Sequence, residues 1–372
     1  MVTDTKIKSR FRGYLIGILL IVGAFASYYY WSMAQQRLHV EQLLGQKIIL
    51  NLRYYCPEMT PQLKQAASEQ GEELVCKTPM TQLPSELASL ITDTSLGGVI
   101  LFSDNLVSPR QIIGLTQQLQ QAARASLLAQ PLFISVDQEG GRVVRLPRDF
   151  GTAFSGNMAI GATFQRHQSN YAYRVGQVFG NELTALGINI NHAPSVDVNI
   201  NPDNPVINVR SFGDDPLTVA ELGIAMVNGM QSNGLIATLK HFPGHGDTHT
   251  DSHTGLPVVN HNLSTFTQVD LKPFEMAIRQ TNIEMIMTAH IQYPAIDNSK
   301  IVNKLGQMML KPATLSKTIL TDWLRLKLGY QGVIVTDALD MAGISDFFSP
   351  LTATWQTFNA GSDIAMMPLN IE

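Results

Sequence analysis

The chain has 372 residues, of which 45% are hydrophobic and 15% are charged. A chain of this length and composition can bury a large core, which excludes an intrinsically disordered protein. The net charge of −4, with no basic stripe in the body of the chain, argues against a nucleic-acid partner.

The N-terminus carries a basic flank and then an apolar stretch. The flank holds four cations: Lys6, Lys8, Arg10 and Arg12. Residues 13–33, GYLIGILLIVGAFASYYYWSM, contain about 18 apolar or aromatic side chains, the length of a short membrane span. We interpret residues 1–35 as a cytoplasmic flank and a membrane anchor, because the aromatic cluster Tyr28–Trp31 suits a membrane interface.

The orientation of this segment follows from its charges. A basic flank stays in the cytoplasm, which places the body outside it, in the periplasm or the extracellular space. The alternative is a signal peptide with a cleavage site at Ala24–Ala26 and a secreted body. The two cysteines, Cys56 and Cys76, lie beyond the segment, and in an oxidising compartment we expect them to form a disulfide rather than two free thiols.

Apolar runs alternate with amphipathic stretches from residue 45 onward. Eight runs predict strands: 48–53, 97–102, 131–137, 188–191, 234–242, 284–290, 332–339 and 362–368. Such continuous runs fit strands that are buried on both faces of a parallel sheet. Helical patterns include 109–129, 173–187 with Gly187 as its stop, and 312–330 with Pro312 in its first turn.

This alternation predicts an α/β fold. We expect a TIM-like (β/α)8 barrel over residues 36–372, with a doubly wound open sheet as the alternative. Residues 55–82, which hold both cysteines, are interpreted as an insert after the first strand. No eighth helix follows the last predicted strand, so we expect either that the chain is a fragment or that the barrel is sealed in another way.

Polar residues follow five of the eight predicted strands. Active sites of TIM-like barrels lie at the C-terminal ends of the strands. These residues are Asp137, the segment NHAPSVDVN, Lys240 with His241, His290, and Asp337. We therefore expect them to share one rim and to form an active site.

The segment KHFPGHGDTHTDSH, residues 240–253, holds four of the nine histidines. Histidines four residues apart on a helix can hold zinc, which would make a zinc hydrolase. Pro243, Gly244 and Gly246 disfavour a helix here, so the segment is predicted to be a loop that forms one wall of the site. We expect His245 and His249 to serve loop structure or to face solvent.

The residue types at this rim suit glycoside hydrolysis. This chemistry needs a carboxylate as nucleophile or base and a proton donor for the leaving oxygen. Asp337 is the candidate nucleophile, and His253 held by Asp251 is the candidate donor. Three cations and one histidine would hold sugar hydroxyls, although Arg210 could instead pair with Asp137: Arg145, Arg210, Lys240 and His241.

Six motifs carry a family resemblance: VDQEGGRVVRL (136–146), HAPSVDVN (192–199), NPVINVRSFGDDP (204–216), KHFPGHGDTHTDSH (240–253), IMTAHIQYPAID (286–297) and GVIVTDALDM (332–341). Together they resemble glycoside hydrolase family 3, in its β-N-acetylglucosaminidase branch. The resemblance implies a TIM-like barrel and a retaining, double-displacement mechanism without metal or cofactor. It implies Asp337 as nucleophile and His253 as acid/base with Asp251 as its partner. It also implies substrate binding by Asp137, Arg145, Arg210, Lys240 and His241. Asn208 departs from the glycine that many members have before the arginine motif.

The expected activity is therefore an exo-acting β-N-acetylglucosaminidase. Its carbohydrate substrate would end in β-linked N-acetylglucosamine, in a cell-wall muropeptide or a chitin oligosaccharide. The enzyme alternatives are a β-glucosidase or xylosidase, which the ending Asp251-Ser252-His253 disfavours, and a phosphorolytic variant. The alternative outside enzymes is a membrane-anchored sugar-binding protein.

Overall fold

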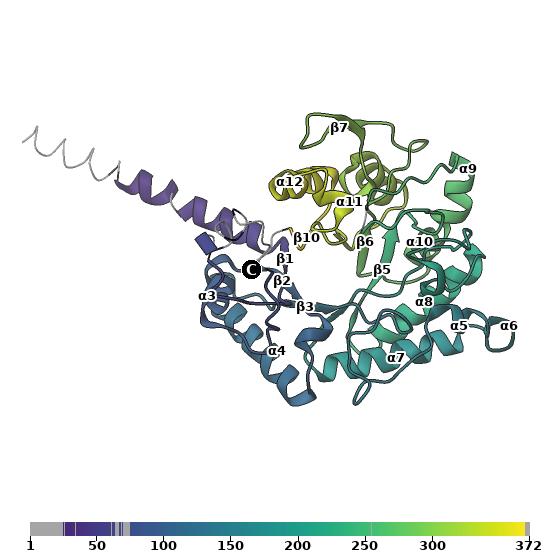
Figure 1. Ribbon diagram of the computed structural model, residues 1–372, viewed down its shortest axis with the longest axis horizontal. Helices are drawn as coiled ribbons and strands as arrows, with labels where there is room; N and C mark the ends of the chain where they lie inside the picture. The colour runs from purple at the N-terminus through teal and green to yellow at the C-terminus, as the bar shows by residue number, and fades with distance from the viewer. Residues whose placement is uncertain are drawn as a thin grey trace, which may run out of the picture.

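The computed structural model describes residues 25, 27–33, 35–60, 62–63, 67, 69, 75–253 and 255–368. The helical residues 27–33 and 35–45 project from a body in which helices surround a sheet (Figure 1). The predicted membrane segment, residues 13–33, lies largely outside the described residues. Within the described ones, no helix combines the length and the apolar character that crossing a bilayer requires.

Eight parallel strands form the body in the order β10-β1-β2-β3-β4-β5-β6-β9. Their bounds are β1 Ile48–Asn51, β2 Gly98–Ile100, β3 Phe133–Val136, β4 Ile190–Asn191, β5 Ile236–Phe242, β6 Met285–Thr288, β9 Val333–Val335 and β10 Ala365–Met366. β10 pairs with β1, and a bridge between Val335 and Ile364 joins it to the end of β9. The predicted TIM-like barrel is confirmed and the open sheet is wrong. The prediction of a missing final helix concerns residues 369–372, which lie outside the described ones.

Helices connect most of these strands. The α-helices are α3 Ser85–Thr94, α4 Pro109–Arg124, α5 Asn157–Gly161, α6 Phe164–His167, α7 Asn170–Ala185, α8 Pro216–Gln231, α9 Leu263–Thr265, α10 Lys272–Gln280, α11 Ala342–Ser345 and α12 Pro350–Ala360. Short 3-10 turns cover Ser103–Asn105, Asn208–Arg210 and Ala313–Leu315, and π-helical turns cover Phe266–Asp270 and Thr318–Lys327.

Three of the long helices begin with the same local signal, a capping side chain followed by proline. Ser108, Asp215 and Ser349 each accept a backbone N–H from the first turn, and a proline occupies the next position. α7 ends as predicted near Gly187, whose φ of +80° suits glycine. The N–H of Ile188 then reaches back to the carbonyl of Leu183.

The single helix predicted over 312–330 is wrong. Pro312 is extended and precedes a 3-10 turn, and a separate π-helical segment begins at Thr318. The break comes at Ser316, whose hydroxyl accepts the N–H of Ile319 and so caps the second segment. The hairpin of β7 (Lys300–Val302) and β8 (Met308–Leu310) was not predicted.

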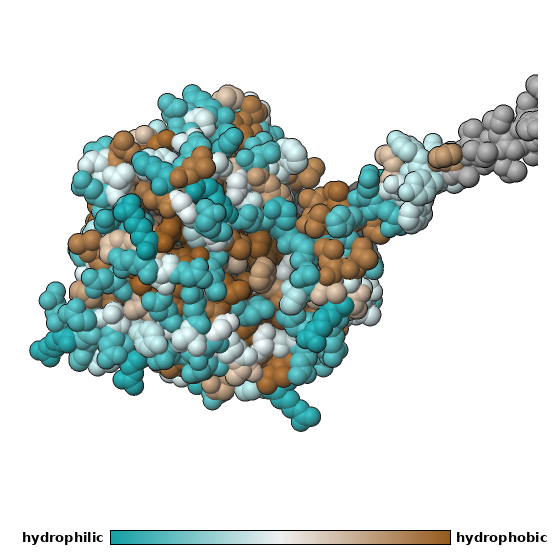
Figure 2. All heavy atoms as spheres, turned by 180° about the vertical axis from the view of Figure 1, so that it is seen from behind, coloured by the Kyte–Doolittle hydropathy of each residue, from teal (hydrophilic) through white to brown (hydrophobic). Residues whose placement is uncertain are grey.

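The described residues form three apolar core clusters, the smallest of which includes Leu315, Ile344 and Phe348. A second one fills the barrel with side chains from the strands: Ile49, Ile100, Ile190, Met285, Met287, Val335 and Met366. The largest one lies between the outward faces of the strands and the helices that cover them. Figure 2 shows mostly hydrophilic residues on the outside of the body, with apolar ones toward its middle and near the projecting helix. This rigid frame fixes the loops at the C-terminal ends of the strands.

A stapled ribbon follows β1. Residues 53–56 run antiparallel to residues 76–80, with a bridge between Tyr54 and Pro79. Cys56 and Cys76 form a disulfide across it, which is the predicted pairing. The side-chain amide of Asn105 donates to the carbonyls of Leu52 and Met80. The ribbon therefore holds the chain that leaves β1 at the rim of the barrel.

Candidate active site

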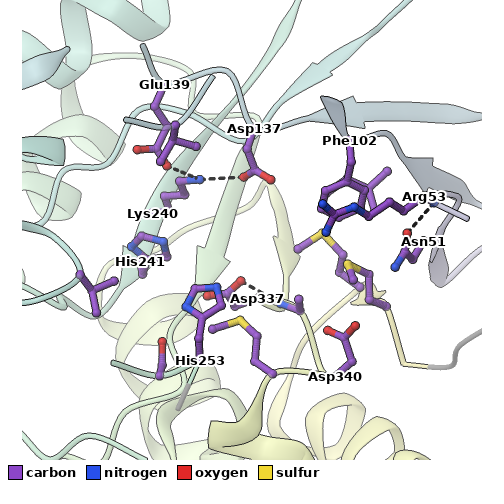
Figure 3. Close-up of a pocket in the computed structure, with 18 of the residues that line it drawn as sticks. Asn51, Arg53, Phe102, Asp137, Glu139, Lys240, His241, His253, Asp337 and Asp340 are labelled. Atoms are coloured by element: carbon purple, nitrogen blue, oxygen red, sulfur yellow. Dashed lines mark hydrogen bonds and ion pairs between the residues drawn. The ribbon is translucent and has the colours of Figure 1, made fainter. Parts of the chain in front are cut away.

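A cavity of about 760 Å³ opens at the C-terminal ends of the strands (Figure 3). Every predicted site residue except Asp251 lines it: Asp137, Arg145, Arg210, Lys240, His241, His253 and Asp337. They come from the ends of β3, β5 and β9 and from the loops after β3, β4 and β5. The structure thus brings together residues that lie up to two hundred positions apart, because parallel strands end at one rim.

An ionic network occupies one side of this cavity. Lys240 is 2% exposed, and its Nζ lies 2.9 Å from Asp137 Oδ1 and 2.7 Å from Glu139 Oε1. Arg210 donates to both oxygens of Glu139, at 2.7 and 2.9 Å, while Arg145 lies 3.5 Å from Asp137. The pairing of Asp137 with Arg210, considered from sequence, is wrong: Glu139 is the partner of Arg210. We call these five residues the ionic network.

The charges of the network hold each other in the ionised state. Burial alone would raise the pKa of Glu139, but Arg210 and Lys240 outweigh it and lower the pKa to about 2. Burial opposes ionisation of Asp137 too, yet Lys240 and the cations around it hold its pKa well below the usual range. The pKa of Lys240 is raised, since Asp137 and Glu139 outweigh the effect of burial. The network therefore presents fixed charges at neutral pH.

His241 is oriented by Asp197, a fully buried carboxylate after β4. The Nδ1 of His241 lies 2.7 Å from Asp197 Oδ2, and the backbone N–H groups of His241 and His245 donate to Oδ1. Burial disfavours the carboxylate, but His241 and these hydrogen bonds hold the pKa of Asp197 well below its usual range. The proton on Nδ1 therefore faces Asp197, and Nε2 faces Arg210 at 3.4 Å.

Asp337 lies just past the end of β9, at the centre of the cavity (Figure 3). Its Oδ1 accepts the N–H of Ala338 at 2.8 Å. Burial would raise its pKa, but nearby His290 and His241 and this hydrogen bond lower it. His290 is itself fully buried, bonded to Thr314 at 2.8 Å and to the carbonyl of Ala338 at 2.9 Å, so it supports the turn that carries Asp337.

His253 stands at the exposed end of the loop after β5. Its Nδ1 and its backbone N–H both lie 2.8 Å from Asp251 Oδ1, as the sequence predicts for this pair. The His253 side chain is 62% exposed and lines the same cavity as Asp337. With Nδ1 bonded to Asp251, Nε2 is left to face a substrate.

The other two histidines of this loop lie in different surroundings, and His245 packs edge-on against His241, with 5.7 Å between the ring centroids. His245 is buried, not solvent-facing, and bonds Thr248 and Ser252. His249 is exposed and bonds Asn201. Within the part of the chain that the structure describes, no three His, Cys, Asp or Glu side chains are grouped as a metal site requires.

His261, which lies outside the segment 240–253, anchors the loop after β5. His261 lies 2.8 Å from Asp247 through Nε2 and 2.7 Å from Asp270 through Nδ1. Asp247 belongs to the loop after β5, and Asp270 ends the π-helical turn before α10. His261 therefore ties the loop to the helical layer.

Sequence reasoning missed Glu139, Asp197 and Arg53. Glu139 lies two positions after Asp137 in the same motif, and Asp197 lies in the motif after the fourth strand. Both could therefore have been named as candidates from the sequence. Arg53 follows the end of β1 and so reaches the same rim, where its backbone is bonded to the stapled ribbon. Asn208 has a φ of +38°, a left-handed conformation that asparagine tolerates better than most residues, so it can stand in a glycine position.

Similarity to known proteins agrees with this geometry. The family model for the glycosyl hydrolase family 3 N-terminal domain matches residues 61–371. Beta-hexosaminidase A of Pseudoalteromonas piscicida is 54% identical over 91% of this chain and 55% of that protein. The Beta-hexosaminidase of Thiobacillus denitrificans is 34% identical over 77% of this chain and 75% of that protein.

Solved structures give the same result. A glycoside hydrolase family 3 beta-N-acetylglucosaminidase from a Paenibacillus species has 39% identity and a TM-score of 0.75, over 88% of this chain and 54% of that one. This chain thus spans about half the length of that enzyme and of the Pseudoalteromonas protein.

Proposed function

The chain belongs to glycosyl hydrolase family 3, and from this we propose that it is a retaining exo-β-N-acetylglucosaminidase. It would release terminal β-linked N-acetylglucosamine from chitin oligosaccharides or cell-wall muropeptides. One observation carries the proposal: an ionised, partly buried Asp337 and a carboxylate-held, exposed His253 line the same cavity. This is the pair that double displacement requires.

In the first step, an oxygen of Asp337 attacks the anomeric carbon. A bond forms between them while the bond to the leaving oxygen breaks, and His253 Nε2 gives its proton to that oxygen. Asp251 keeps Nδ1 protonated and stabilises the imidazole in its charged state before transfer. The products of this step are a glycosyl ester on Asp337 and a free leaving group.

In the second step, water replaces the ester. His253 takes a proton from water, the water oxygen attacks the anomeric carbon, and Asp337 leaves as a carboxylate. Two displacements at one carbon retain its configuration. The lowered pKa of Asp337 keeps it ionised, as attack requires, and makes it a good leaving group in the second step.

The ionic network is suited to hold the sugar. Asp137 offers acceptors to hydroxyl groups, and Lys240, Arg145 and Arg210 offer donors beside it. His241 presents Nε2 toward the same space. Because these groups are already paired and buried, they would bind with little reorganisation.

The proposal extends to location. We place the body outside the cytoplasm, anchored through residues 13–33, with secretion after signal cleavage as the alternative. The disulfide between Cys56 and Cys76 supports an oxidising compartment, where such bonds persist.

The test compares two chromogenic substrates, the para-nitrophenyl β-N-acetylglucosaminide and the β-glucoside. Wild type should cleave the first, and Asp337→Ala should lose on the order of 10⁴-fold or more in kcat/KM. Added azide should then yield an α-glycosyl azide, since it enters from the face that the nucleophile vacates. Asp149→Ala, at an exposed position outside the cavity, is the control.

A second set of variants tests His253 as the proton donor. His253→Ala should lose activity while His249→Ala, in the same loop and also exposed, retains it. Preference for the glucoside would favour a β-glucosidase or xylosidase, and a glycosyl phosphate formed in phosphate buffer would favour phosphorolysis. A folded protein that binds the sugar and cleaves neither substrate would be a sugar-binding protein.

A further inference from the structure

The cavity extends beyond the ionic network. Its volume of about 760 Å³ lies well inside the range of sites that enclose drug-sized ligands, roughly 300–1,000 Å³. That leaves room for more than one sugar ring. Across Asp337 from the ionic network, a different set of residues lines it, which we call the second half-pocket: Asn51, Arg53, Phe102 and Asp340 (Figure 3).

Arg53 is held in place before any ligand arrives. Its Nε donates to Asp104 at 2.6 Å, and its guanidinium carbon lies 5.1 Å from the ring centroid of Tyr54 and 5.3 Å from that of Phe102. The backbone of Arg53 is bonded to Asn51 and to Met80 of the stapled ribbon. Because the Arg53 side chain is already ordered, binding a ligand costs little additional side-chain entropy.

The terminal nitrogens of Arg53 are the groups available to a ligand. Asp104 engages Nε, while the side chain remains 44% exposed and lines the cavity. Figure 3 shows it extending past Phe102 toward the space above Asp337. Planar donors beside an aromatic face match a sugar ring, which offers hydroxyl and amide oxygens at its edge and C–H groups on its face.

The charge of the second half-pocket selects among sugars. The guanidinium of Arg53 is paired with Asp104, and that of Arg145, which lies 5.7 Å from the ring centroid of Phe102, is paired with Asp137. Asp340 adds a carboxylate to the lining of the cavity. The two cations are thus balanced by carboxylates, which leaves no net positive charge to hold a carboxylate on a ligand, and Asp340 would repel a desolvated anion. An uncharged ring with oxygen acceptors would meet no such repulsion.

On the basis of the proposed function, we propose that the second half-pocket is the leaving-group subsite and that it takes an uncharged amino sugar. Arg53 sets this specificity through hydrogen bonds to the second ring, which stacks on Phe102. Chitin oligosaccharides then fit the site better than muropeptides, whose second sugar carries a carboxylate on its lactyl group.

The experiment measures kcat/KM of the full chain on three substrates. One is the aryl N-acetylglucosaminide, which has no second sugar; the others are N,N′-diacetylchitobiose and the disaccharide of N-acetylglucosamine with N-acetylmuramic acid. Wild type should prefer the chitobiose over the acidic disaccharide. Arg53→Gln should lower kcat/KM for chitobiose about tenfold, the effect of one or two hydrogen bonds, and leave the aryl substrate within about twofold.

Two further variants separate charge from fold. Arg174→Gln, at an exposed position of α7, should change none of the three rates. Asp340→Asn removes the carboxylate that lines the second half-pocket and should raise kcat/KM for the acidic disaccharide several-fold. An equal loss on all substrates in Arg53→Gln would overturn the subsite, and so would a wild-type preference for the acidic disaccharide that Arg53→Gln abolishes.

Failure of the subsite and failure of the proposed function give different results. If wild type cleaves the aryl N-acetylglucosaminide but Arg53→Gln shows no selective loss, only the subsite is wrong. If wild type cleaves nothing, titration calorimetry on the Asp337→Ala variant still tests the subsite. Chitobiose should then bind more tightly than N-acetylglucosamine, and Arg53→Gln should remove that difference; equal affinities would overturn the subsite.

Discussion

The two ends of the segment 240–253 differ in almost every physical respect. Lys240 and His241 are buried, and carboxylates fix their positions: Asp137 and Glu139 for Lys240, and Asp197 for His241. His253 is 62% exposed and bonded to Asp251, which is 34% exposed itself. The difference suits the proposed roles: groups that bind a sugar gain from being rigid and shielded from water, whereas a proton donor must reach a leaving group and then water. Burying a charge costs several kcal/mol unless it is paired, so the buried end is fixed when the chain folds.

Removing the charge at the buried end should have the largest effect. Lys240→Met leaves Asp137 without its main cation and Glu139 with only Arg210, which should cost about 3–5 kcal/mol in the free energy of unfolding and abolish activity. Urea denaturation followed by circular dichroism measures the first, and hydrolysis of the aryl N-acetylglucosaminide the second. Lys300→Met, at an exposed position of β7, is the matched control. An unchanged urea midpoint for Lys240→Met would contradict the view that this end is structurally fixed.

The exposed end should respond in activity but not in stability. Asp251→Asn removes the negative charge that supports His253, so kcat should fall by about 10²-fold while KM changes little. The unfolding free energy should stay within about 0.5 kcal/mol, the usual range for surface changes. Steady-state kinetics and the same denaturation assay check both, with Asp149→Asn as control. A large loss of stability would show that the two ends are not as independent as their contacts indicate.

The smallest expected effect concerns the anchor at His261, through its dependence on pH. Hydrogen bonds to Asp270 and the charges of Asp270 and Asp247 raise the pKa of His261 above its usual 6.5. Because the folded pKa is the higher one, this contribution to stability is complete below pH 6.5 and is lost as the pH rises through the folded value. The hydrogen bonds to the charged ring should contribute about 1.5 kcal/mol.

Denaturation midpoints across this pH window measure the effect. Wild type should lose stability above pH 6.5, and His261→Asn should flatten that slope. The ionic network has the opposite dependence: its carboxylates have lowered pKa values, so their contribution is lost only in acid, as the pH falls toward about 2 for Glu139. An unchanged slope in His261→Asn would mean that other groups control the loop on the alkaline side.

The strands were predictable because each is a continuous apolar run, and burial on both faces demands such a run. The rim residues followed, since barrel strands end at one face. The β7–β8 hairpin was missed because each of its strands is only three residues long and half of their side chains are exposed, unlike the buried runs of the barrel strands. The helix predicted from residue 312 failed because a tertiary contact decides it: Ser316, buried against Asp297, caps a new segment there.

The site divides in the same way. Asp337, Asp251 and His253 each lie in a motif that is local in sequence. The pairing of Asp251 with His253 could be predicted because they are two positions apart. Glu139 was overlooked because nothing local shows that Arg210 and Lys240 converge on it. Arg53 depends on the ribbon, on the disulfide that closes it and on Asp104, which lies about fifty positions away. Contacts of that kind come from the fold and leave no periodic trace.

Because β10 pairs with β1, the barrel cannot close until the ribosome has synthesised β10. β1 is the first barrel strand to leave the ribosome, and its edge stays unpaired until Ala365 and Met366 emerge. At ordinary translation rates that wait is on the order of tens of seconds. Met366 and Met367 also line the cavity, so a nascent chain holds an incomplete pocket until its last strand has been made.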